Sequence, residues 1–276
     1  MQNCESCAFK NPKGTATAII IKDNKVLLLK RNEEPFKGMM DLPGGYMQEG
    51  ETPEITVTRE VMEELGVEPK EVTLMKMFAG TAYWKDSSFP VISHFYLVDI
   101  GNQEIKLNDE SSEYSWTPLK ELAYMNLPMF IAFDSNQEFV KYLAKNFTFD
   151  LVRVVELVKQ LDSSAVLNEQ ALYKAVINGR VATFKDGDKL VAMGWIYPRQ
   201  TMLRHQAVIE DMICDMDYRG QGLGQKILTE LLNWAKLRGV EVVELTSGWH
   251  REAAHGLYKK NGFQIHDTAH MLKFLK

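Results

Sequence analysis

Residues 44–67 read GGYMQEGETPEITVTREVMEELGV, and this stretch decides the fold of the N-terminal half. It is rich in glutamate but contains one arginine and no lysine. Thr52 is a good helix N-cap, Pro53 suits the first helical position and Gly66 is a typical end. The stretch therefore predicts a helix over 53–65 that follows a glycine-rich loop.

Three glutamates of this helix share one face, because positions i, i+3 and i+4 lie side by side. They are Glu60, Glu63 and Glu64. Three ionised carboxylates repel one another, and a hard divalent cation such as Mg²⁺ or Mn²⁺, which prefers oxygen ligands, would balance them. The alternative is an ordinary charged surface helix. The backbone of Gly44 and Gly45 can approach a phosphate or metal closely.

The full spacing resembles the Nudix box. Gly45, five residues, Glu51, seven residues and then REVMEELGV from Arg59 match its fixed positions. Over roughly residues 1–147 the chain therefore resembles a Nudix hydrolase. The resemblance implies an α/β/α sandwich that hydrolyses a nucleoside diphosphate linked to another moiety. It also implies a metal held by Glu60, Glu63 and Glu64, with the Gly45 carbonyl nearby.

Within this resemblance Glu60 could instead orient or deprotonate the attacking water. Arg59 is expected to pair with Glu51 and fix the loop to the helix.

A further catalytic acid often comes from a later loop in this family. The candidates in NDESSEYSW are Asp109, Glu110 and Glu113, of which Glu113 is favoured; the alternative is a solvated loop charge. Residues 111–118 are expected to form a loop before a short helix. NCESC, LPGGY and MFIAFD are similar to members that act on ADP-ribose, NADH or related dinucleotides. Tyr83 stands where dinucleoside-polyphosphate hydrolases tend to carry tyrosine, although a core tyrosine is the alternative.

Near residue 147 the pattern restarts, without a low-complexity linker. Two helical segments, a hairpin turning at 185–188 and a strand ending at Cys214 precede RGQGLG (219–224) and a long amphipathic helix. A further strand, a helix and a last strand are expected to complete this half. A glycine-rich turn at a helix N-terminus suits a pyrophosphate. It is neither a Walker motif nor a Rossmann turn.

From about 148 to 276 the chain resembles the GNAT acyltransferases, through VIEDMICDMDYRGQGLGQKIL and the ending LYKKNGF. The resemblance implies a mixed-sheet domain that binds acetyl-CoA. Its pantetheine would lie against Met212, Ile213 and Cys214. Its pyrophosphate would lie at the glycine-rich loop, which consists of Arg219, Gly220, Gln221, Gly222, Leu223 and Gly224.

In this family a substrate amine attacks the thioester directly, and a base must accept the amine proton. Tyr258 matches the family's usual acid, with a packed tyrosine as the alternative. Glu210 is the candidate base, with Asp211 behind it. His255 either contacts coenzyme A or lies on the surface. Cys214 is expected to be an inert strand cysteine.

Composition narrows the remaining possibilities. The net charge of −5 gives no reason to expect nucleic-acid binding, and no apolar run approaches the length of a membrane span. We expect a cytoplasmic protein with no membrane partner. Three cysteines are too few for a disulfide framework. Cys4 and Cys7 are either reduced thiols or half of a zinc site that another ligand or partner chain completes.

The sequence thus predicts an α/β (α+β) chain with a hydrolase domain over 1–147 and an acetyltransferase domain over 148–276. Its small molecules would be a nucleotide-type substrate, favoured to be ADP-ribose or a dinucleotide, and acetyl-CoA with an unidentified amine. The alternative is that the first domain only senses a nucleotide and regulates the acetyltransferase. The acceptor amine belongs either to a small molecule or to a protein.

Overall fold

The chain divides into two compact units in the computed structural model, which describes residues 11–84, 87–267, 271 and 273. Unit 1 extends to Val152 and also takes in Asn168–Ile177. Unit 2 consists of Arg153–Leu167 and the chain from Asn178 onward. Cys4 and Cys7, with their two alternatives, lie outside the described residues.

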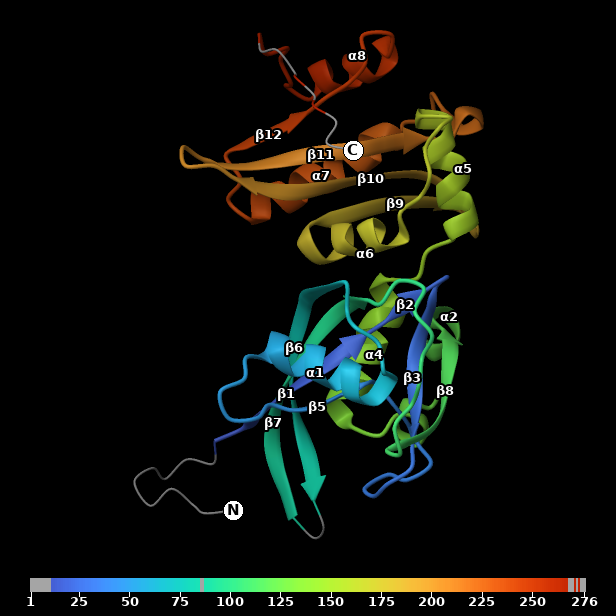
Figure 1. The fold of residues 1–276 in the computed structure, drawn as a ribbon. Helices are drawn as coiled ribbons and strands as arrows, with labels where there is room; N and C mark the ends of the chain where they lie inside the picture. The colour runs from blue at the N-terminus through green and yellow to red at the C-terminus, as the bar shows by residue number, and fades with distance from the viewer. Residues whose placement is uncertain (1–10, 85–86, 268–270, 272, 274–276) are drawn as a thin grey trace. The chain divides into compact units, whose positions relative to one another are not determined.

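Two sheets form the centre of unit 1 (Figure 1). Their strands are β1 (Lys13–Ile19), β2 (Ile21–Lys22), β3 (Lys25–Arg31), β4 (Met40–Asp41), β5 (Gly44–Tyr46), β6 (Glu71–Trp84), β7 (Ser87–Asp99) and β8 (Ser111–Pro118). One sheet has the order β5-β1-β7-β6, in which only β1 and β7 are parallel. In the other, β3 pairs with β2, β4 and β8, all antiparallel.

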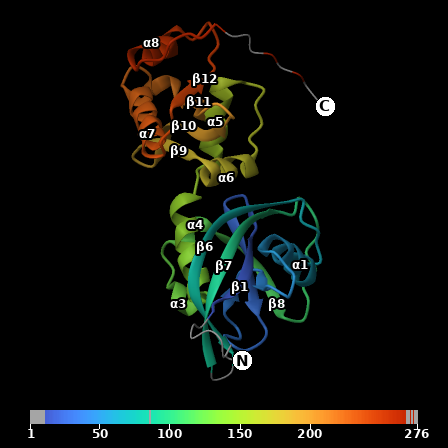
Figure 2. The ribbon, with the colours of Figure 1, turned by 90° about the vertical axis from the view of Figure 1, so that its left-hand side faces the viewer.

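Helices cover both faces of the first sheet, as Figure 2 shows for α1 and α4. The helices of this unit are α1 (Pro53–Leu65), α2 (Leu119–Leu122), α3 (Leu127–Phe130), α4 (Asp134–Asn146) and α6 (Glu169–Asn178). Alternate residues of β1 enter two separate cores: Ala16 and Ala18 join α1, while Ile19 joins Phe139 of α4. The predicted α/β/α arrangement is confirmed.

Helix α6 belongs to unit 1 although it follows the predicted boundary at 147/148. Tyr173 is fully buried in the α4-side core beside Phe147. Glu169 accepts hydrogen bonds from the backbone N–H groups of Asp23 (2.9 Å) and Asn24 (3.0 Å), which form the turn between β2 and β3. It also accepts one from the Tyr173 hydroxyl. Burial raises the pKa of Tyr173, so its hydroxyl stays a donor.

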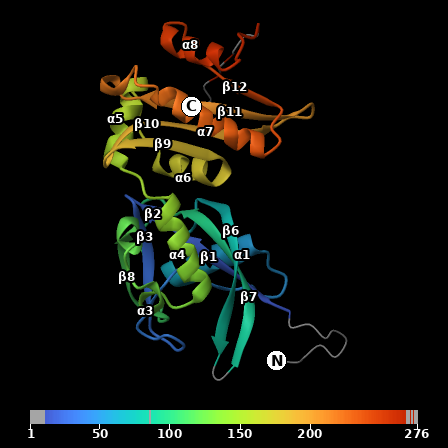
Figure 3. The same ribbon diagram turned by 180° about the vertical axis from the view of Figure 1, so that it is seen from behind.

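Unit 2 is a mixed sheet of order β12-β11-β10-β9, in which only β11 and β12 are parallel. Its elements are α5 (Leu151–Leu161), which begins in unit 1, then β9 (Arg180–Asp186), β10 (Lys189–Gln200), β11 (His205–Cys214), η1 (Met216–Tyr218), α7 (Leu223–Leu237), β12 (Val242–Leu245) and α8 (Glu252–Lys260). Figure 3 shows α7 lying across one face of this sheet. There Ile227, Leu228 and Leu231 pack against Ile196 and Ile209.

One local prediction was wrong, and a second concerns a segment that lies partly outside the described residues. Residues 111–118 were expected to form a loop, but they form β8, because they pair with the buried β3 from Pro118 back to Ser111, with one register shift that leaves out Ser112. The last strand expected after α8 does not form within the described residues 261–267. Among the described residues, no helix combines the length and apolar character that crossing a membrane requires.

Candidate active sites

Helix α1 carries the glutamate face, and its predicted bounds are confirmed. The hydroxyl of Thr52 accepts a hydrogen bond from the N–H of Ile55 (3.4 Å), and Gly66 ends the helix in the left-handed conformation, with φ 64°. One side of the helix is fully buried against the sheet through Val57, Val61 and Leu65. This anchoring fixes where the glutamates on the neighbouring side lie.

The strand before α1 depends on having two glycines. A Cβ on Gly44, whose φ is 148°, would lie 2.3 Å from the carbonyl oxygen of Ala16. A Cβ on Gly45 would lie 2.2 Å from Oε1 of Glu60. The backbone therefore approaches the helix at contact distance, and the N–H of Gly44 donates to Oε2 of Glu64 (2.9 Å). No other residue type permits this approach.

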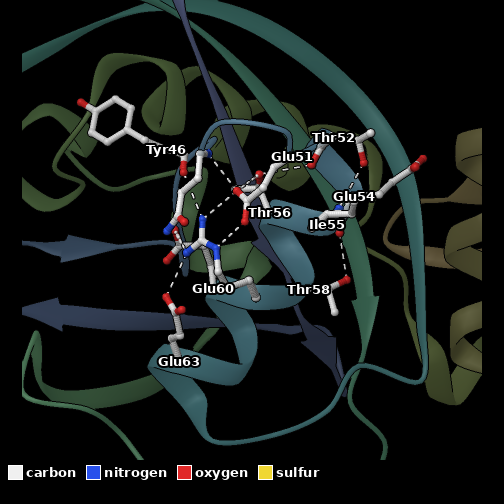
Figure 4. A network of polar contacts seen from close by, with 11 residues as sticks. Tyr46, Glu51, Thr52, Glu54, Ile55, Thr56, Thr58, Glu60 and Glu63 are labelled. Atoms are coloured by element: carbon white, nitrogen blue, oxygen red, sulfur yellow. Dashed lines mark hydrogen bonds and ion pairs between the residues drawn. The ribbon is translucent and has the colours of Figure 1, made fainter.

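Arg59 joins the loop to the helix through a polar network, and Figure 4 labels its partners Tyr46, Glu51, Glu60 and Glu63. Its Nε and Nη2 donate to the two oxygens of Glu51 (2.7 and 3.0 Å), which confirms the expected pair. Its Nη1 also contacts Glu60 (2.8 Å) and Glu63 (2.9 Å), and Nη2 donates to the Tyr46 carbonyl (3.1 Å). The i, i+4 spacing to Glu63 was a signal for this second set of contacts.

Two of the three face glutamates are removed from water. Glu64 is 8% exposed, and burial, followed by the charge of Glu60, raises its pKa well above the ordinary value. Burial also raises the pKa of Glu60, against the lowering effect of Arg59. By contrast, hydrogen bonds led by those from Arg59 lower the pKa of Glu51 to about 2. Glu51 is therefore ionised at neutral pH. Glu60 and Glu64 are carboxylates whose ionised form a nearby positive charge would stabilise.

A small polar cavity adjoins Glu64. It measures about 40 Å³, and its lining includes Arg31, Asp41 and Glu110. Asp41 is buried and bonded to Arg31 (3.0 Å), yet burial raises its pKa. The charges of Asp41 and Glu110 both contribute to the raised pKa of Glu64. Sequence reasoning missed Asp41, because no local pattern brings β4 beside α1.

Glu113, the favoured further acid, does not line this cavity. It lies on β8 with a largely exposed side chain, in an ion pair with Lys30 (2.9 Å) on the facing strand. Glu110 comes from the loop before β8 and reaches the cavity instead. The backbone carbonyl of the third candidate, Asp109, accepts from Asn32 (3.0 Å).

The donor chemistry of this site suits a hard divalent cation. Glu60, Glu63 and Glu64 offer only oxygen ligands, and two of them lie where negative charge is costly. Among the described residues, no three carboxylate, histidine or cysteine side chains are already arranged around a common metal position. Nη1 of Arg59 contacts the carboxylates of both Glu60 and Glu63.

Aromatic rings stand on the strands beside this loop. Tyr46 follows Gly45 directly; its ring is 42% exposed and lies 6.0 Å from that of Phe89. The ammonium of Lys13 lies 5.6 and 4.7 Å from these two rings. Tyr83 is 43% exposed and contacts Phe36 edge-on, so it is not a fully buried core tyrosine.

In unit 2 the sheet opens beside the expected coenzyme strand. β11 pairs with β12 only from Gln206 to Ile209, where β12 ends at Leu245. β11 continues to Cys214 with β10 on its other side. In the described part of the chain, no strand pairs with this edge of residues 210–214. Their backbone groups can therefore bind an extended ligand such as pantetheine. Met212, Ile213 and Cys214 all lie on this segment.

The glycine-rich loop forms the entry to α7. Gly220 and Gly222 adopt φ 78° and 77°, and a Cβ on either would meet no atom within 4 Å. These glycines are needed for backbone conformation, and the space in front of them is open. Gly224 lies inside α7, where a Cβ would be 3.1 Å from Leu257 of α8. Arg219 bonds the carbonyl of Cys214 (3.4 Å), while Gln221 is exposed.

The candidate base and acid come from different elements. Glu210, half-buried on β11, is in register with Trp195. Its neighbour Asp211 has φ 48° and accepts from the Trp195 indole (3.1 Å), so the side chain of Asp211 lies beside β10. Tyr258 of α8 is partly buried against the α7 core. Burial raises its pKa, so its hydroxyl is protonated at neutral pH.

The surroundings of Cys214 favour its expected role as an inert strand cysteine. Burial raises the pKa of the Cys214 thiol, which disfavours the nucleophilic thiolate. His255 contacts the ring of Trp249 edge-on at 6.0 Å.

Comparison with known proteins identifies both units. Residues 12–137 match the NUDIX domain family, and residues 155–263 match the Acetyltransferase (GNAT) family. The chain is 36% identical over 135 residues to an ADP-ribose pyrophosphatase from Methanocaldococcus jannaschii, which covers 49% of this chain and 75% of that protein. The chain therefore belongs to the Nudix family, and it carries a GNAT acetyltransferase domain as well.

Other similarities cover one half of the chain at a time. An uncharacterized N-acetyltransferase from M. jannaschii is 30% identical over 97 residues, which is 35% of this chain and 40% of that protein. The Nudix domain of Shewanella oneidensis NrtR, solved with ADP ribose, is 26% identical with a TM-score of 0.42. That match covers 51% of this chain and 92% of the solved one.

Proposed function

We propose that unit 1 hydrolyses a nucleoside diphosphate linked to another moiety, with Mg²⁺ or Mn²⁺ as cofactor, and that unit 2 transfers the acetyl group of acetyl-CoA to an amine. One observation carries the first half of the proposal. Glu60 and Glu64, two carboxylates of raised pKa, meet the backbone of Gly44–Gly45 at contact distance. A surface helix has no need of that approach.

Glu60, Glu63 and Glu64, with the Gly45 carbonyl, would hold the cation. When bound, it would neutralise diphosphate charge and make a nucleophile of water. The remaining roles, which are to orient and hold these carboxylates, fall to the side chains and backbone of the protein. The N–H of Gly44 orients Glu64. The two hydrogen bonds from Arg59 to Glu51 keep the loop and the helix together when Nη1 of Arg59 releases Glu60 and Glu63 to the cation. As the further acid we propose Glu110 in place of Glu113, because Glu110 lines the cavity beside Glu64.

The favoured substrate is ADP-ribose or a related dinucleotide. The archaeal relative that covers most of the Nudix unit carries the name ADP-ribose pyrophosphatase. The exposed ring of Tyr46, with Lys13 beside it, offers a stacking surface and a positive charge one residue from Gly45. A base carrying a diphosphate has the matching chemistry.

The test is turnover of a substrate panel by the full-length protein with Mg²⁺. The panel holds ADP-ribose, NADH, dinucleoside polyphosphates, nucleotide sugars and nucleoside triphosphates, with products read by mass. Glu64→Gln and Glu63→Gln should each abolish turnover. Glu54→Gln, an exposed change in the first turn of the same helix, should leave it intact. Binding of one nucleotide without any turnover would instead support the sensing role.

In unit 2, the amine nitrogen attacks the thioester carbon as Glu210, directly or through water, takes its proton. The C–N bond forms and the C–S bond breaks. Tyr258 then protonates the departing thiolate, for which its raised pKa keeps the proton available. The loop of Arg219–Gly224 would bind the pyrophosphate, and residues 212–214 of β11, which lie beyond the end of the pairing with β12, would bind the pantetheine.

This half is tested with acetyl-CoA and a panel of amines that includes small molecules and peptides. Tyr258→Phe and Glu210→Gln should each lower kcat by about 10²-fold or more, the scale of general acid–base catalysis. Glu230→Gln, an exposed partner of Arg180, is the matched control. Unchanged kcat in both site variants would reject these roles.

A further inference from the structure

Unit 2 contains a buried ion pair between Arg153 and Asp215. Arg153, at the start of this unit, is 9% exposed, and Asp215, directly after β11, is 3% exposed. Arg153 donates Nη2 to Asp215 Oδ2 and Nε to the carbonyl of Leu190 (2.8 Å). Two charges are seldom buried without a role in fixing geometry, because their desolvation is costly.

Asp215 also ties down the segment that leads into the glycine-rich loop. Its Oδ1 accepts from the N–H of Asp217 (3.2 Å) and from Gln160 of α5 (3.4 Å). Its own N–H donates to the carbonyl of Val191, and its carbonyl accepts from the N–H of Tyr218, both at 2.9 Å. Lys189 adds a longer ion pair (3.6 Å). One side chain thus connects α5, β10 and the turn of η1.

Neighbouring contacts hold the same segment from other sides. Gln160 accepts from the N–H of Met216 (3.0 Å), and the Tyr218 hydroxyl donates to Asp186 at the end of β9 (3.1 Å). Beyond Arg219 the situation changes, because Gly220 and Gly222 have open space around their Cα atoms. The contacts above therefore hold the entry of the loop, while its glycines face open space.

We propose that Arg153, Asp215 and Gln160 are positioning residues that preorganise the 219–224 backbone for the pyrophosphate of acetyl-CoA. The inference rests on the proposed function of unit 2. Glycines at positive φ lose much backbone entropy when they are ordered. If the loop becomes ordered only when the ligand binds, this loss of entropy weakens the binding affinity. These three side chains order the loop before the ligand arrives. Their contribution should appear in coenzyme affinity and in the exchange of loop amides.

The experiment measures the Kd of acetyl-CoA by calorimetry on the full-length protein. Asp215→Asn should raise Kd about tenfold, and Gln160→Met, which spares the ion pair, about threefold. Glu156→Gln removes the charge of the exposed glutamate on the same helix that forms an ion pair with Arg153, and it should leave Kd unchanged. The double variant Arg153→Met, Asp215→Leu removes both charges together, which buried pairs often tolerate in folding.

That double variant separates positioning from stability. We expect it to remain folded, to bind acetyl-CoA at least about tenfold more weakly and to exchange the amides of 219–222 faster. A folded double variant with wild-type Kd would overturn the inference. If the wild-type protein binds no acetyl-CoA, the proposed function fails by itself. In that case, equal exchange rates at 219–222 in wild type and variants would also reject the positioning role.

Discussion

Gly45 lies so close to Glu60 that a single added carbon would stand 2.2 Å from the carboxylate oxygen. The glutamate face of α1 and the loop before it are therefore one assembly. Gly45→Ala should displace Glu60 and lower hydrolase turnover by about 10²-fold or more, the scale of a misplaced catalytic group. Steady-state kinetics with ADP-ribose would check this. Gly256→Ala, at an open position of α8, should change nothing. Normal turnover by Gly45→Ala would contradict the placement of Glu60 in the hydrolase site.

Glu64 should destabilise the metal-free protein at neutral pH. Its pKa in the folded state is raised, so the folded state holds the proton more tightly, and stability falls as pH rises from the ordinary value through the raised one. In EDTA, Glu64→Gln should increase the unfolding free energy by about 1 kcal/mol at pH 7.

The same variant should lose most of the stabilisation that Mg²⁺ gives the wild-type protein, because ligand binding to the folded state raises its stability. Thermal melts of both proteins, with and without the metal, measure the two effects together. A wild-type Tm that ignores Mg²⁺ would contradict the metal site.

Glu51 predicts the opposite pH dependence. Its pKa is lowered to about 2 by Arg59, so its pairing stabilises the protein above the ordinary carboxyl pKa and is lost as pH falls toward 2. The Tm difference between wild type and Glu51→Gln should therefore be largest near neutral pH and shrink with acidification. Glu54→Gln, on the exposed first turn, serves as the control. A difference that does not vary with pH would mean that Arg59 does not hold an ionised Glu51.

Unit 1 should need α6 for its stability. Tyr173→Phe removes the hydroxyl that donates to Glu169 and should cost about 1–3 kcal/mol, because the carboxylate of Glu169 loses one of its hydrogen bonds. Chemical denaturation followed through the hydrolase activity would report on this unit. A fragment ending at Phe147 should be less stable still, since it lacks the buried Tyr173 ring. A fragment as stable as the full chain would show that α6 is dispensable.

Local signals predicted the helix and its glutamate face well. Thr52, Pro53 and Gly66 act within a few residues of one another, so the sequence alone defines where α1 begins and ends. The pair between Arg59 and Glu51 was equally readable, because both flank the same helix start. In each case the interacting groups are close along the chain.

The long-range features could not be predicted in the same way. Asp41 and Glu110 reach Glu64 through the pairing of β3 with β4 and β8, which brings distant segments together. The unit to which α6 belongs depends on where the Tyr173 ring is buried. The helical pattern of its sequence fits packing against either unit equally well. The ion pair of Arg153 with Asp215 joins residues 62 positions apart.

The chain passes from unit 1 into unit 2 at Arg153 and returns to unit 1 for Asn168–Ile177. From Asn178 onward it belongs to unit 2. During synthesis the hydrolase unit is therefore incomplete until residue 177 has left the ribosome. By then α5 of the acetyltransferase unit has already emerged. Domains usually fold one after another from the N-terminus. Here the order of translation overlaps the two folding events, and the coding sequence cannot be divided between the two units at a single codon without taking a helix from one of them.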